Sequence, residues 1–368
     1  MRIIGDLGPY CLTSEGLTEG PCAREVEEHR DLGYGSFNFL YGPSAGGLLE
    51  SVGFEIATYG ESIERIGHVP YKGRQIKITQ LPVEEALIRV ERINGAFAAS
   101  HSISFLQAVE KAFEAEVPYE VTVSRMAQLE LERIRNNLFV IQRVLESASF
   151  LVPSYLLLQQ VEEVNRTIAR SCGHRYFFGA NYPGRVECEH EVPSLKIGDV
   201  EKILENRIFI DRLQGNGVIK EDNSIGPAAR ASGFRYDARL DSDLFVYRDF
   251  DLKVPTQDHG DAFSRILVRL EEIKESLRIL QELRVKPHTF PMRVRDGEGI
   301  GRVESPSGDL AYLVRIRHGR IERAFLLAPS SVNMRLFLRS MPGNIFTDFP
   351  FNWESFGIWI SELEVDLK

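Results

Sequence analysis

The stretch of sequence that decides the fold is residues 121–148, VTVSRMAQLELERIRNNLFVIQRVLESA. Its apolar positions 127, 131, 134, 138, 141 and 145 follow one another in steps of four or three residues. An α-helix completes a turn in about 3.6 residues, so these side chains share one stripe along a helix. A stripe this regular is typical of a helix that packs along a seam in a bundle. The stretch therefore predicts a long bundle helix.

Other segments repeat this helical spacing. They are residues 82–115, 153–170, 258–283 and, as a shorter addition, 198–214. The first begins with Pro82 and two glutamates. Proline suits a first helical turn because the N–H groups there have no partner within the helix, and the glutamates suit it because this end of the helix dipole is positive. Asp258 or Asp261 can cap the helix that ends near residue 283. Three or four long helices with such seams indicate an antiparallel bundle.

Strand-like patterns are short and flank the helices. They cover residues 54–59, 63–66, 301–306, 310–317 and 321–327. The glycine-rich first forty-odd residues are expected to be loop. We therefore predict a mainly α fold, a long helical bundle flanked by small β elements. The expected division is a loop-rich segment 1–41 and a single domain 42–368, made of a β region (42–80), the bundle (81–286), and a small β region with the C-terminal tail (287–368).

The composition is that of an ordinary globular protein with an acidic balance. The 368 residues carry 44 Lys+Arg against 53 Asp+Glu, a net charge of −9. This charge disfavours a nucleic-acid partner, because phosphate backbones attract basic surfaces. The longest apolar runs, such as 150–158, are far shorter than the ~20 residues that span a bilayer, and the first residues break before a signal-peptide core forms. A soluble or peripheral membrane protein is expected.

The cysteines and a search for generic catalytic motifs give little information about function. Cys11, Cys22, Cys172 and Cys188 are scattered, with no Cys-x-x-Cys pair. Such thiols are expected to be reduced cytosolic cysteines, with a Cys11–Cys22 disulfide as the alternative. The chain contains no His-Glu-x-x-His, Gly-x-Ser-x-Gly or phosphate-binding Gly-x-x-x-x-Gly-Lys sequence. The glycine-rich run 297–301 is expected to be a flexible turn rather than a nucleotide loop.

Six motifs in the order of one family run along the chain. They are Gly42-Pro43 with IGHVPYKG at 66–73, ERINGAFAASHS at 91–102, ELER at 130–133, GPAARASGFRYD at 226–237, GDAFSR at 260–265 and GRVESPSG at 301–308. On these motifs the chain resembles the large catalytic subunit of membrane-bound nickel–iron hydrogenases and its relative, the quinone-site (49 kDa-type) subunit of respiratory complex I. The resemblance covers about residues 40–350 and implies the hydrogenase large-subunit fold.

The chain departs from the hydrogenase pattern at the metal site. That site needs four cysteine thiolates, since soft sulfur ligands hold these metals in this fold. The first two positions hold Asn94 and Phe97, and the region of the other two, 347–354, contains no cysteine. The arginine that the family places beside the metal corresponds to Ser307. The resemblance therefore implies that this chain binds no metal or cofactor of its own, and that the iron–sulfur cluster lies in a partner subunit.

The chain departs from the quinone-site pattern as well. The tyrosine, histidine and aspartate of that site correspond to Gly95, to Ala45 or a neighbour, and to about Ser147, none of which can relay a proton. An emptied cavity is expected, and its predicted border is Gly42, Pro43, Ala45, Asn94, Gly95, Phe97 and Ser147. The catalytic candidates that the motifs retain are Arg92, His101, Asp237 and Glu304, accompanied by Arg230. A buried charge network that only holds the bundle is the equally weighted alternative.

Arg92 and His101 are nine residues apart on one expected helix. This is 2.5 turns, so an ideal straight helix would place them on opposite faces. They can share a small site only if the helix breaks, which Gly95 makes possible because glycine weakens a helix interior. We expect Arg92 to face the partner's cluster. His101 is expected to lie deeper, as a proton-accepting or scaffold group, although a lone helical histidine is more often a hydrogen-bonded core residue.

Three functions follow from these observations. The favoured one is the large subunit of a complex I-like, hydrogenase-related, membrane-associated oxidoreductase, taking part in electron transfer from an iron–sulfur small subunit, coupled to ion translocation. The alternatives are a non-catalytic structural or coupling subunit of such a complex, which leaves open whether the chain has its own active site, and a free-standing binding protein. The aromatic residues of the tail (Phe349, Phe351, Trp353, Phe356 and Trp359) form either an exposed patch or part of the core.

The resemblance also implies partners and a location. The expected partners are a complex I B-type iron–sulfur subunit, a C-type subunit, an H-type membrane subunit and antiporter-like subunits, with no nucleic acid. The expected location is the cytoplasmic face of the cell membrane, as a peripheral protein. NAD binding and quinone binding belong to the resembled complex as a whole.

Overall fold

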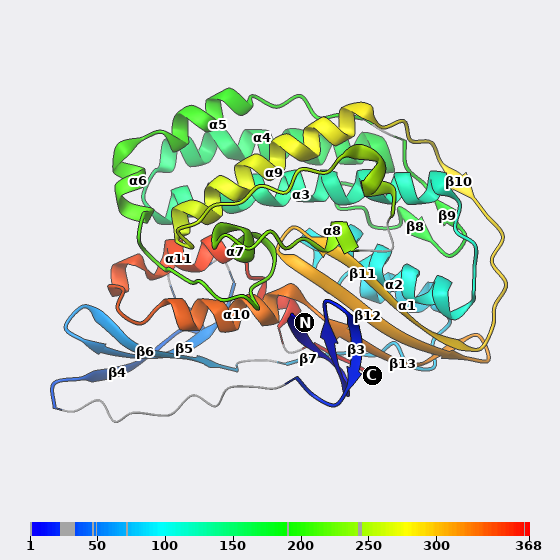
Figure 1. Cartoon of the computed structure of the whole chain (residues 1–368), viewed down its shortest axis with the longest axis horizontal. Coiled ribbons are helices and arrows are strands. Elements are labelled where there is room, and N and C mark those ends of the chain that lie inside the picture. Colours follow the sequence, from blue (N-terminus) through cyan, green and yellow to red (C-terminus); the bar gives the residue numbers. More distant parts are fainter. Residues whose placement is uncertain are drawn as a thin grey trace.

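Three long helices form the upper layer of the computed structural model (Figure 1). They are α3 (Tyr119–Ser147), α4 (Leu151–Cys172) and α9 (Ala262–Glu282), and α3 packs against both of the others. All six seam positions of α3 predicted from the sequence are buried. Asp261 caps α9, since its carboxylate accepts a hydrogen bond from the Ser264 N–H at 2.7 Å. The structure describes residues 2–22, 34–45, 48, 50–70, 73–189, 191–241, 245–363 and 365–368.

The helix expected over residues 82–115 is in fact two helices with a break. Helix α1 (Val83–Val90) ends before Asn94, and a short 3-10 turn η1 (Gly95–Phe97) leads into α2 (Ala98–Ala112). Asn94 has an extended backbone, and its side chain accepts a hydrogen bond from the Ala96 N–H at 3.0 Å. The asparagine therefore starts a new helix where the apolar spacing alone continued the old one.

A three-stranded antiparallel sheet packs directly on α2. Its strands are β11 (Gly297–Ser305), β12 (Gly308–Arg317) and β13 (Arg320–Leu327). The run 297–301, expected to be a turn, is the first half of β11. A Cβ on Gly297, Gly299 or Gly301 would overlap the backbone carbonyl of Ala112, Ala108 or Ser104, respectively. Two strand residues advance about 6.8 Å and four helix residues about 6.0 Å, so the glycines match successive helical turns.

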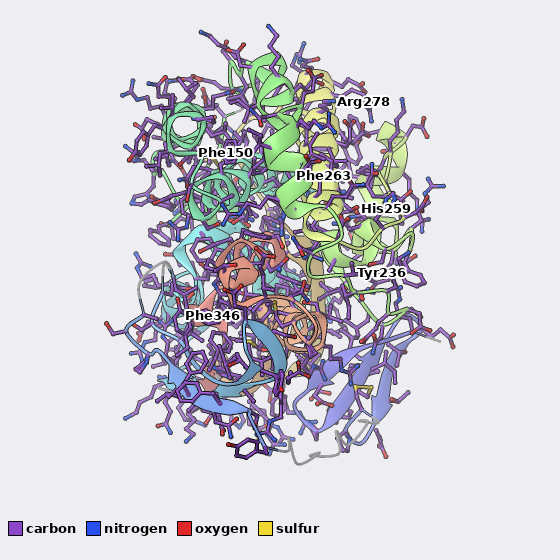
Figure 2. All side chains as sticks on the ribbon, turned by 90° about the vertical axis from the view of Figure 1, so that its left-hand side faces the viewer. Phe150, Tyr236, His259, Phe263, Arg278 and Phe346 are labelled. Carbon is purple, nitrogen blue, oxygen red and sulfur yellow. A yellow bond between two sulfur atoms is a disulfide. The ribbon has the colours of Figure 1, made fainter. Side chains whose placement is uncertain are left out.

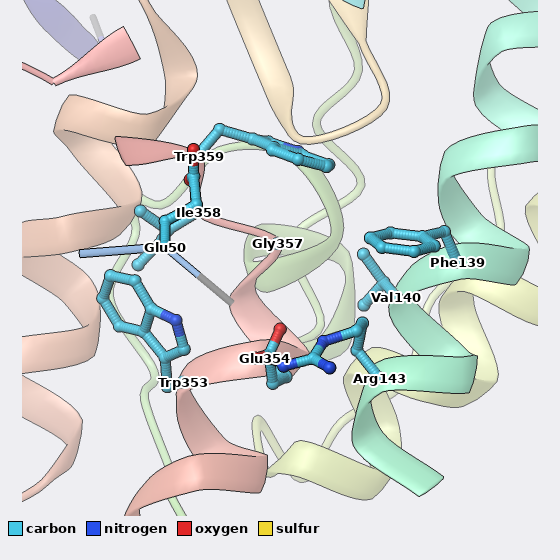
Figure 3. A pocket seen from close by; sticks show the side chains of 9 residues that line it. All are labelled: Glu50, Phe139, Val140, Arg143, Trp353, Glu354, Gly357, Ile358 and Trp359. Atoms are coloured by element: carbon cyan, nitrogen blue, oxygen red, sulfur yellow. Dashed lines mark hydrogen bonds and ion pairs between the residues drawn. The ribbon is translucent and has the colours of Figure 1, made fainter. Parts of the chain in front are cut away.

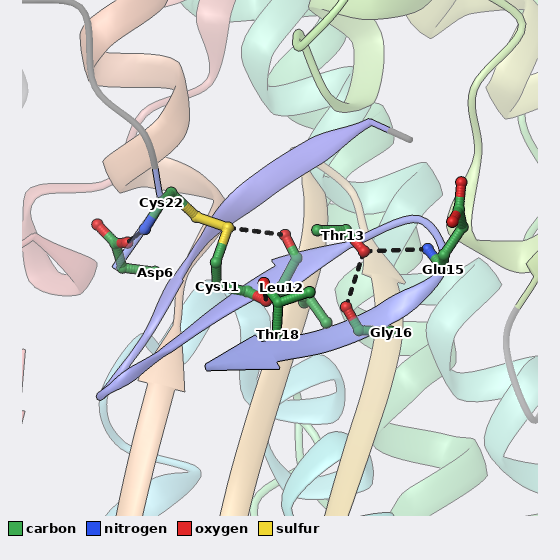
Figure 4. Close-up of a disulfide and its surroundings, with 8 residues drawn as sticks. All are labelled: Asp6, Cys11, Leu12, Thr13, Glu15, Gly16, Thr18 and Cys22. Carbon is green, nitrogen blue, oxygen red and sulfur yellow. Dashed lines mark hydrogen bonds between the residues drawn. A yellow bond between two sulfur atoms is a disulfide. The ribbon is translucent and has the colours of Figure 1, made fainter. Parts of the chain in front are cut away.

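The N-terminal segment is not loop, because residues 3–19 form a sheet. Its strands are β1 (Ile3–Leu7), β2 (Tyr10–Thr13) and β3 (Gly16–Glu19). Figure 4 shows the Cys11–Cys22 disulfide at this sheet, where the Cys22 N–H donates to Asp6 Oδ1 at 2.7 Å. A second disulfide joins Cys172 at the end of α4 to Cys188. The expectation of four reduced cysteines is therefore wrong; the alternative, a Cys11–Cys22 disulfide, holds, and the Cys172–Cys188 disulfide was not predicted.

Three further sheets complete the described β structure. A meander is formed by β4 (Phe37–Tyr41), β5 (Gly53–Tyr59) and β6 (Ser62–Val69), and β7 (Arg74–Ile76) pairs in parallel with β14 (Val365–Leu367). The third contains β8 (Asn181–Tyr182), β9 (Arg185–Val186) and β10 (His288–Thr289). The structure is 45% helix and 21% strand, so the fold is mixed α/β and the mainly α prediction is wrong. The sequence hid these strands because most are short and lack a clean alternation.

The remaining helices are short and connect the layers. They are α5 (Ile197–Leu204), α6 (Arg207–Leu213), α7 (Gly226–Ala231), α8 (Ala238–Asp241), η2 (Phe245–Phe250), α10 (Pro329–Ser340), η3 (Phe346–Asp348), α11 (Phe349–Phe356) and η4 (Ile360–Glu362). The single helix expected near 198–214 is thus two, because Asn206 starts a new one by accepting from the Ile208 and Phe209 N–H groups. In the part of the chain that the structure describes, no helix combines the length and apolar character needed to cross a bilayer.

The aromatic tail belongs to the core. Phe349, Phe351, Trp353 and Phe356 are each at most 4% exposed. Figure 2 shows Phe346 beside the lower sheets, with Phe150 and Phe263 in the helical layer above. Phe346 contacts Phe39 of β4 edge to face, with ring centroids 5.4 Å apart. The tail therefore packs the helical layer onto the N-terminal strands, and of the two alternatives weighed, core packing holds.

Candidate functional site

Asn94 and Phe97 lie where the C-terminal segment crosses the helix break. The Asn94 side-chain amide donates to Glu362 Oε1 at 2.9 Å, and the Phe97 ring lies 6.0 Å from the ring of Trp359. Asn94 is 2% exposed and Phe97 is fully buried. The segment that meets them is 359–362 rather than 347–354. The position expected to be an emptied cavity is thus filled by an aromatic pair and an amide–carboxylate hydrogen bond.

His101 is fixed between two buried side chains. Its Nδ1 lies 2.7 Å from the Tyr312 hydroxyl and its Nε2 lies 3.3 Å from Glu362 Oε1, and all three residues are almost completely buried. Ser330 also donates to the Glu362 carboxylate. Burial, followed by the nearby Glu362, raises the pKa of the Tyr312 phenol well above its ordinary value. Glu362 therefore joins Asn94, His101 and Ser330, and the resemblance gave no signal for it because its motifs end before residue 360.

Arg92 lies outside this interior group. It precedes the helix break, and 51% of its side chain is exposed. Its guanidinium pairs with Glu91 and lies 4.7 Å from the centre of the Phe178 ring. Glu91 in turn accepts from the Gly179 N–H at 3.0 Å. The structure therefore places Arg92 at the surface and His101 in the core, and does not bring them into one site.

Asp237 and Glu304 belong to a second, fully buried group built around Arg230. The Arg230 guanidinium contacts Asp237 at 3.1 Å, Glu304 at 2.9 Å and Glu272 at 2.6 Å. Arg239 extends the group by pairing with Asp237 at 2.7 Å and with Glu130 at 3.3 Å. Arg133 and Arg269 complete it, since Arg133 pairs with Glu130 and Arg269 donates to Asn137, which donates to Glu272. We call these residues the Arg230 cluster.

The Arg230 cluster is balanced in charge. Four arginines (133, 230, 239 and 269) face four acids (130, 237, 272 and 304), so the sum is 4 − 4 = 0. Burial raises the pKa of Glu304 to about 7, Asp237 adds to the rise and Arg230 opposes it. Burial by itself would also raise the pKa of Asp237, yet Arg239 and Arg230 outweigh it and hold it below its usual range. The cluster joins helices α3, α7, α8 and α9 to strand β11, which suits a scaffold.

The other predicted border residues lie at several places in the fold. Ser147 donates to the carbonyl oxygen of Arg143 at 2.9 Å within its own helix, and Ser307 donates to that of Gly357 at 2.7 Å. The Gly42–Pro43 peptide bond is cis, and Gly42 packs so closely on the Val52 carbonyl that a Cβ would overlap it. Ala45 is partly exposed, and positions 46 and 47 of this loop lie outside the described residues.

Two cavities lie beside Trp359, and neither is lined by Asn94 or Phe97. The smaller, about 20 Å³, is bordered by Glu50, Phe139, Val140, Arg143, Trp353, Glu354, Gly357, Ile358 and Trp359 (Figure 3). In Figure 3 the guanidinium of Arg143 points toward the Glu354 carboxylate, at 2.9 Å. Burial raises the pKa values of Glu354 and Glu50. This space suits a water molecule and little more.

The larger cavity, about 290 Å³, is open to the side of α4. It is bordered by Ala96, Arg135, Asn136, Phe139, Leu158, Val161, Glu162, Asn165, Tyr176 and Trp359. Trp359 stacks on Phe139 with ring centroids 5.9 Å apart, so this pair forms a common wall of both cavities. The sequence did not single out Arg135 and Asn136, because a bundle seam draws attention to apolar positions, and it placed Trp359 only among the aromatic residues of the tail.

The residues present do not fit a nickel–iron centre. Asn94 and Phe97 supply no thiolate, and the four cysteines are joined in two disulfides away from them. Within the described ranges, no three His, Cys, Asp or Glu side chains come together in a way that could hold a metal ion. The chain carries no donor set of the kind that this metal pair needs.

Comparison with known proteins shows which family the chain is similar to. Residues 188–289 match the family described as "Respiratory-chain NADH dehydrogenase, 49 Kd subunit". A D-type NADH-quinone oxidoreductase subunit from Solibacter usitatus is 27% identical, over 70% of this chain and 77% of its own length. Its counterpart in Myxococcus xanthus is 31% identical, over 66% of this chain and 63% of its own length. The chain is related to the 49 kDa-type family.

The fold of this chain also occurs in a solved structure. The "Structure of the membrane-bound sulfane sulfur reductase (MBS), an archaeal respiratory membrane complex" contains a chain with a TM-score of 0.79 and 21% identity, covering 91% of this chain and 100% of that one. The predicted resemblance to complex I and hydrogenase-related large subunits is therefore confirmed. The predictions for individual site residues stay predictions.

Proposed function

We propose that this chain is the large subunit of a complex I-like, hydrogenase-related, membrane-associated oxidoreductase that works without a nickel–iron centre in this subunit. The observation that carries the proposal is the packing at the helix break. Two contacts occupy the place where the resembled hydrogenases hold their metals, that of Asn94 with Glu362 and that of Phe97 with Trp359. The relatives, named as NADH-quinone oxidoreductase subunits, favour a redox complex over the alternative of a purely structural coupling subunit.

The proposed electron donor is the cluster of an iron–sulfur small subunit of the B type. Arg92 supports a donor subunit on its side of the molecule, because it is the predicted candidate that reaches the surface. A cation there stabilises the negative charge that the donor's cluster gains on reduction. His101 is held in the interior by Tyr312 and Glu362, where it orders the helix break and can exchange a proton only with these two groups. The chain's own contribution is then to position and shield the route of the electron.

A surface on α4 supports a protein partner. Five apolar side chains of this helix are between 38% and 71% exposed, and they are Leu151, Val152, Tyr155, Leu156 and Leu158. Monomers rarely expose so continuous an apolar stripe, since its burial stabilises an interface. We assign this surface, rather than the tail, to contacts within the complex. The same proposal has three further parts. It includes a C-type subunit, an H-type membrane subunit and antiporter-like subunits as partners, coupled ion translocation, and a position on the cytoplasmic face.

The test is purification of the affinity-tagged chain from its native membranes. We expect an iron–sulfur subunit and membrane subunits to accompany it, and metal analysis to find iron without nickel. Val152→Glu with Leu156→Glu should weaken the association, because a buried charge without a partner is costly at an interface. The matched control Ile208→Glu changes an apolar residue that is 72% exposed on α6. A monomeric chain, or about one nickel per chain, would contradict the proposal.

A further inference from the structure

The larger cavity has the character of a ligand site rather than a packing defect. Its walls include the rings of Phe139, Tyr176 and Trp359 and the aliphatic side chains of Leu158 and Val161. At about 290 Å³ it approaches the roughly 300 Å³ at which small-molecule pockets begin. Leu158 and Tyr176 are each more than a third exposed, so the cavity has an opening to solvent. A molecule with one ring could enter and fill it.

Five side-chain polar atoms without partners belong to four of the residues that line this cavity. Arg135 Nη1, both side-chain polar atoms of Asn136, Asn165 Oδ1 and Trp359 Nε1 have no hydrogen-bond partner among the described residues. Asn136 and Arg135 are 1% and 4% exposed, and Asn165 is 7% exposed. A buried polar group without a partner destabilises the folded state, and native proteins contain few of them. Their concentration around one cavity indicates that an occupant supplies the missing partners.

The chemistry of the wall is rich in donors. Arg135 Nη2 donates to the Ala96 carbonyl and the guanidinium stacks 5.0 Å from the Tyr176 ring, which leaves Nη1 as a spare donor. Glu132 accepts from the Ala99 and Ser100 N–H groups at 2.8 and 3.0 Å, and Glu162, which lines the cavity, pairs with Arg166 at 3.0 Å and with Arg175. Burial lowers the pKa of Arg135 and Glu132 opposes this. Asn136 Nδ2 and Trp359 Nε1 add two further donors.

We propose that this cavity binds a small organic carboxylate whose apolar body is about the size of one ring. The carboxylate would accept hydrogen bonds from Arg135, Asn136 and Trp359, and the ring would lie among Phe139, Tyr176 and Val161. A charge-assisted hydrogen bond to guanidinium is stronger than one between neutral groups, which favours an anion over a neutral ring. The inference goes beyond the proposed function and does not depend on it, because it concerns cavity residues of the full chain whether or not a partner is present.

The probe is 4-fluorobenzoate, observed by fluorine NMR and by titration calorimetry with the full-length chain. We expect saturable binding, at least tenfold tighter than that of 4-fluorotoluene, which has the same ring and no carboxylate. Equal binding of both molecules would mean that the cavity recognises only apolar rings. Absence of binding would mean that the space belongs to a side chain of a partner protein. Either result overturns the proposal.

Variants separate binding from folding. Trp359→Phe keeps an aromatic ring but removes the N–H, and Asn136→Leu replaces the unpartnered amide by an apolar group of similar size. Both should weaken 4-fluorobenzoate binding at least fivefold, and Asn136→Leu should raise the melting temperature of the probe-free chain. The control is Ser124→Ala, which removes an unpartnered hydroxyl on the same helix away from the cavity and should leave binding unchanged. If Asn136→Leu lowers the melting temperature and leaves binding intact, the amide is structural and the assignment is wrong.

Discussion

At the residue scale, buried polar groups determine how the interior is organised. Glu362 accepts from Asn94 and Ser330 and contacts His101, and Glu304 contacts Arg230 and accepts from the Ala238 N–H at 3.1 Å. Each acid connects elements that are far apart in the sequence. Removing one partner from such a group costs more than the interaction contributes, because the other partner stays buried without compensation. These positions are therefore the most sensitive single sites in the molecule.

The pH dependence of stability should report on Glu304. Since its pKa is raised to about 7, the folded chain keeps this proton up to about that pH, whereas the unfolded chain loses it near its ordinary pKa of about 4.3. The folded state binds more protons between these values, so the free energy of unfolding falls as the pH rises through them. The groups that set this balance are Arg230, Asp237, Asp309 and Arg133.

Glu304→Gln removes this titration and should flatten the profile. We expect the wild-type chain to lose roughly 3 kcal/mol relative to the variant between about pH 4.5 and 7.5. Urea unfolding of both proteins at several pH values measures the difference. Parallel profiles over this range would show that Glu304 is ionised in the folded protein at all of these pH values, and that Arg230 holds it charged.

At the element scale, the contact between α2 and β11 depends on the absence of side chains. Gly299→Ala would place a methyl group against the Ala108 carbonyl, and neither backbone can move without disturbing its own hydrogen bonds. Overpacking of this kind costs about 1–3 kcal/mol, measured by denaturant unfolding. The matched control is Gly67→Ala in β6, where a Cβ would meet no atom within 4 Å. Equal effects of the two substitutions would mean that strand glycines act only through backbone entropy.

The elements differ in how far the sequence predicted them. The long helices were predicted correctly because apolar spacing over twenty or more residues determines both their period and their buried face. Strand β11 was missed in its first half, since glycines carry no hydropathy signal and their role depends on a helix almost two hundred residues away. A break near Gly95 was considered possible, but its cause was not predicted, because Asn94 acts through a local cap that the apolar spacing does not show.

The site was less predictable than the fold. Asn94, Phe97 and the missing thiolates were found by resemblance, and the structure shows what replaces them. Trp359, Glu362 and Arg135 were not found, because their importance comes from contacts across the molecule that no local pattern encodes. Asn94 and Phe97 line neither of the two cavities beside Trp359, and a cavity bordered by all seven predicted residues stays a prediction.

At the scale of the whole molecule, Arg92 and His101 lie in different environments, one at the surface and one in the interior. Arg92 is half exposed beside Phe178, whereas His101 is sealed inside. We expect Arg92→Met to slow electron transfer from the small subunit severalfold without changing assembly, because it removes a surface cation near the proposed donor. Reduction kinetics of the intact complex give the measurement. The control is Arg315→Met on β12, another exposed arginine in a surface ion pair. If turnover is the same in both variants, the donor docks elsewhere.

The close contact of Gly297, Gly299 and Gly301 of β11 with α2 also has a mechanical consequence. Because the backbone of β11 contacts the backbone of α2 directly, no flexible side chains lie between the strand and the helix to absorb a displacement. Gly297 lies at Ala112 and Gly301 at Ser104, so Glu304 near the end of β11 and His101 in the first turn of α2 lie toward the same end of this stiff pair. A displacement of Glu304, such as one produced by gain or loss of a proton, would be transmitted to the neighbourhood of His101 with little loss. The two interior polar groups are thus linked through a stiff contact between α2 and β11, and strand β12, which carries Tyr312 and pairs with β11, adds a second connection.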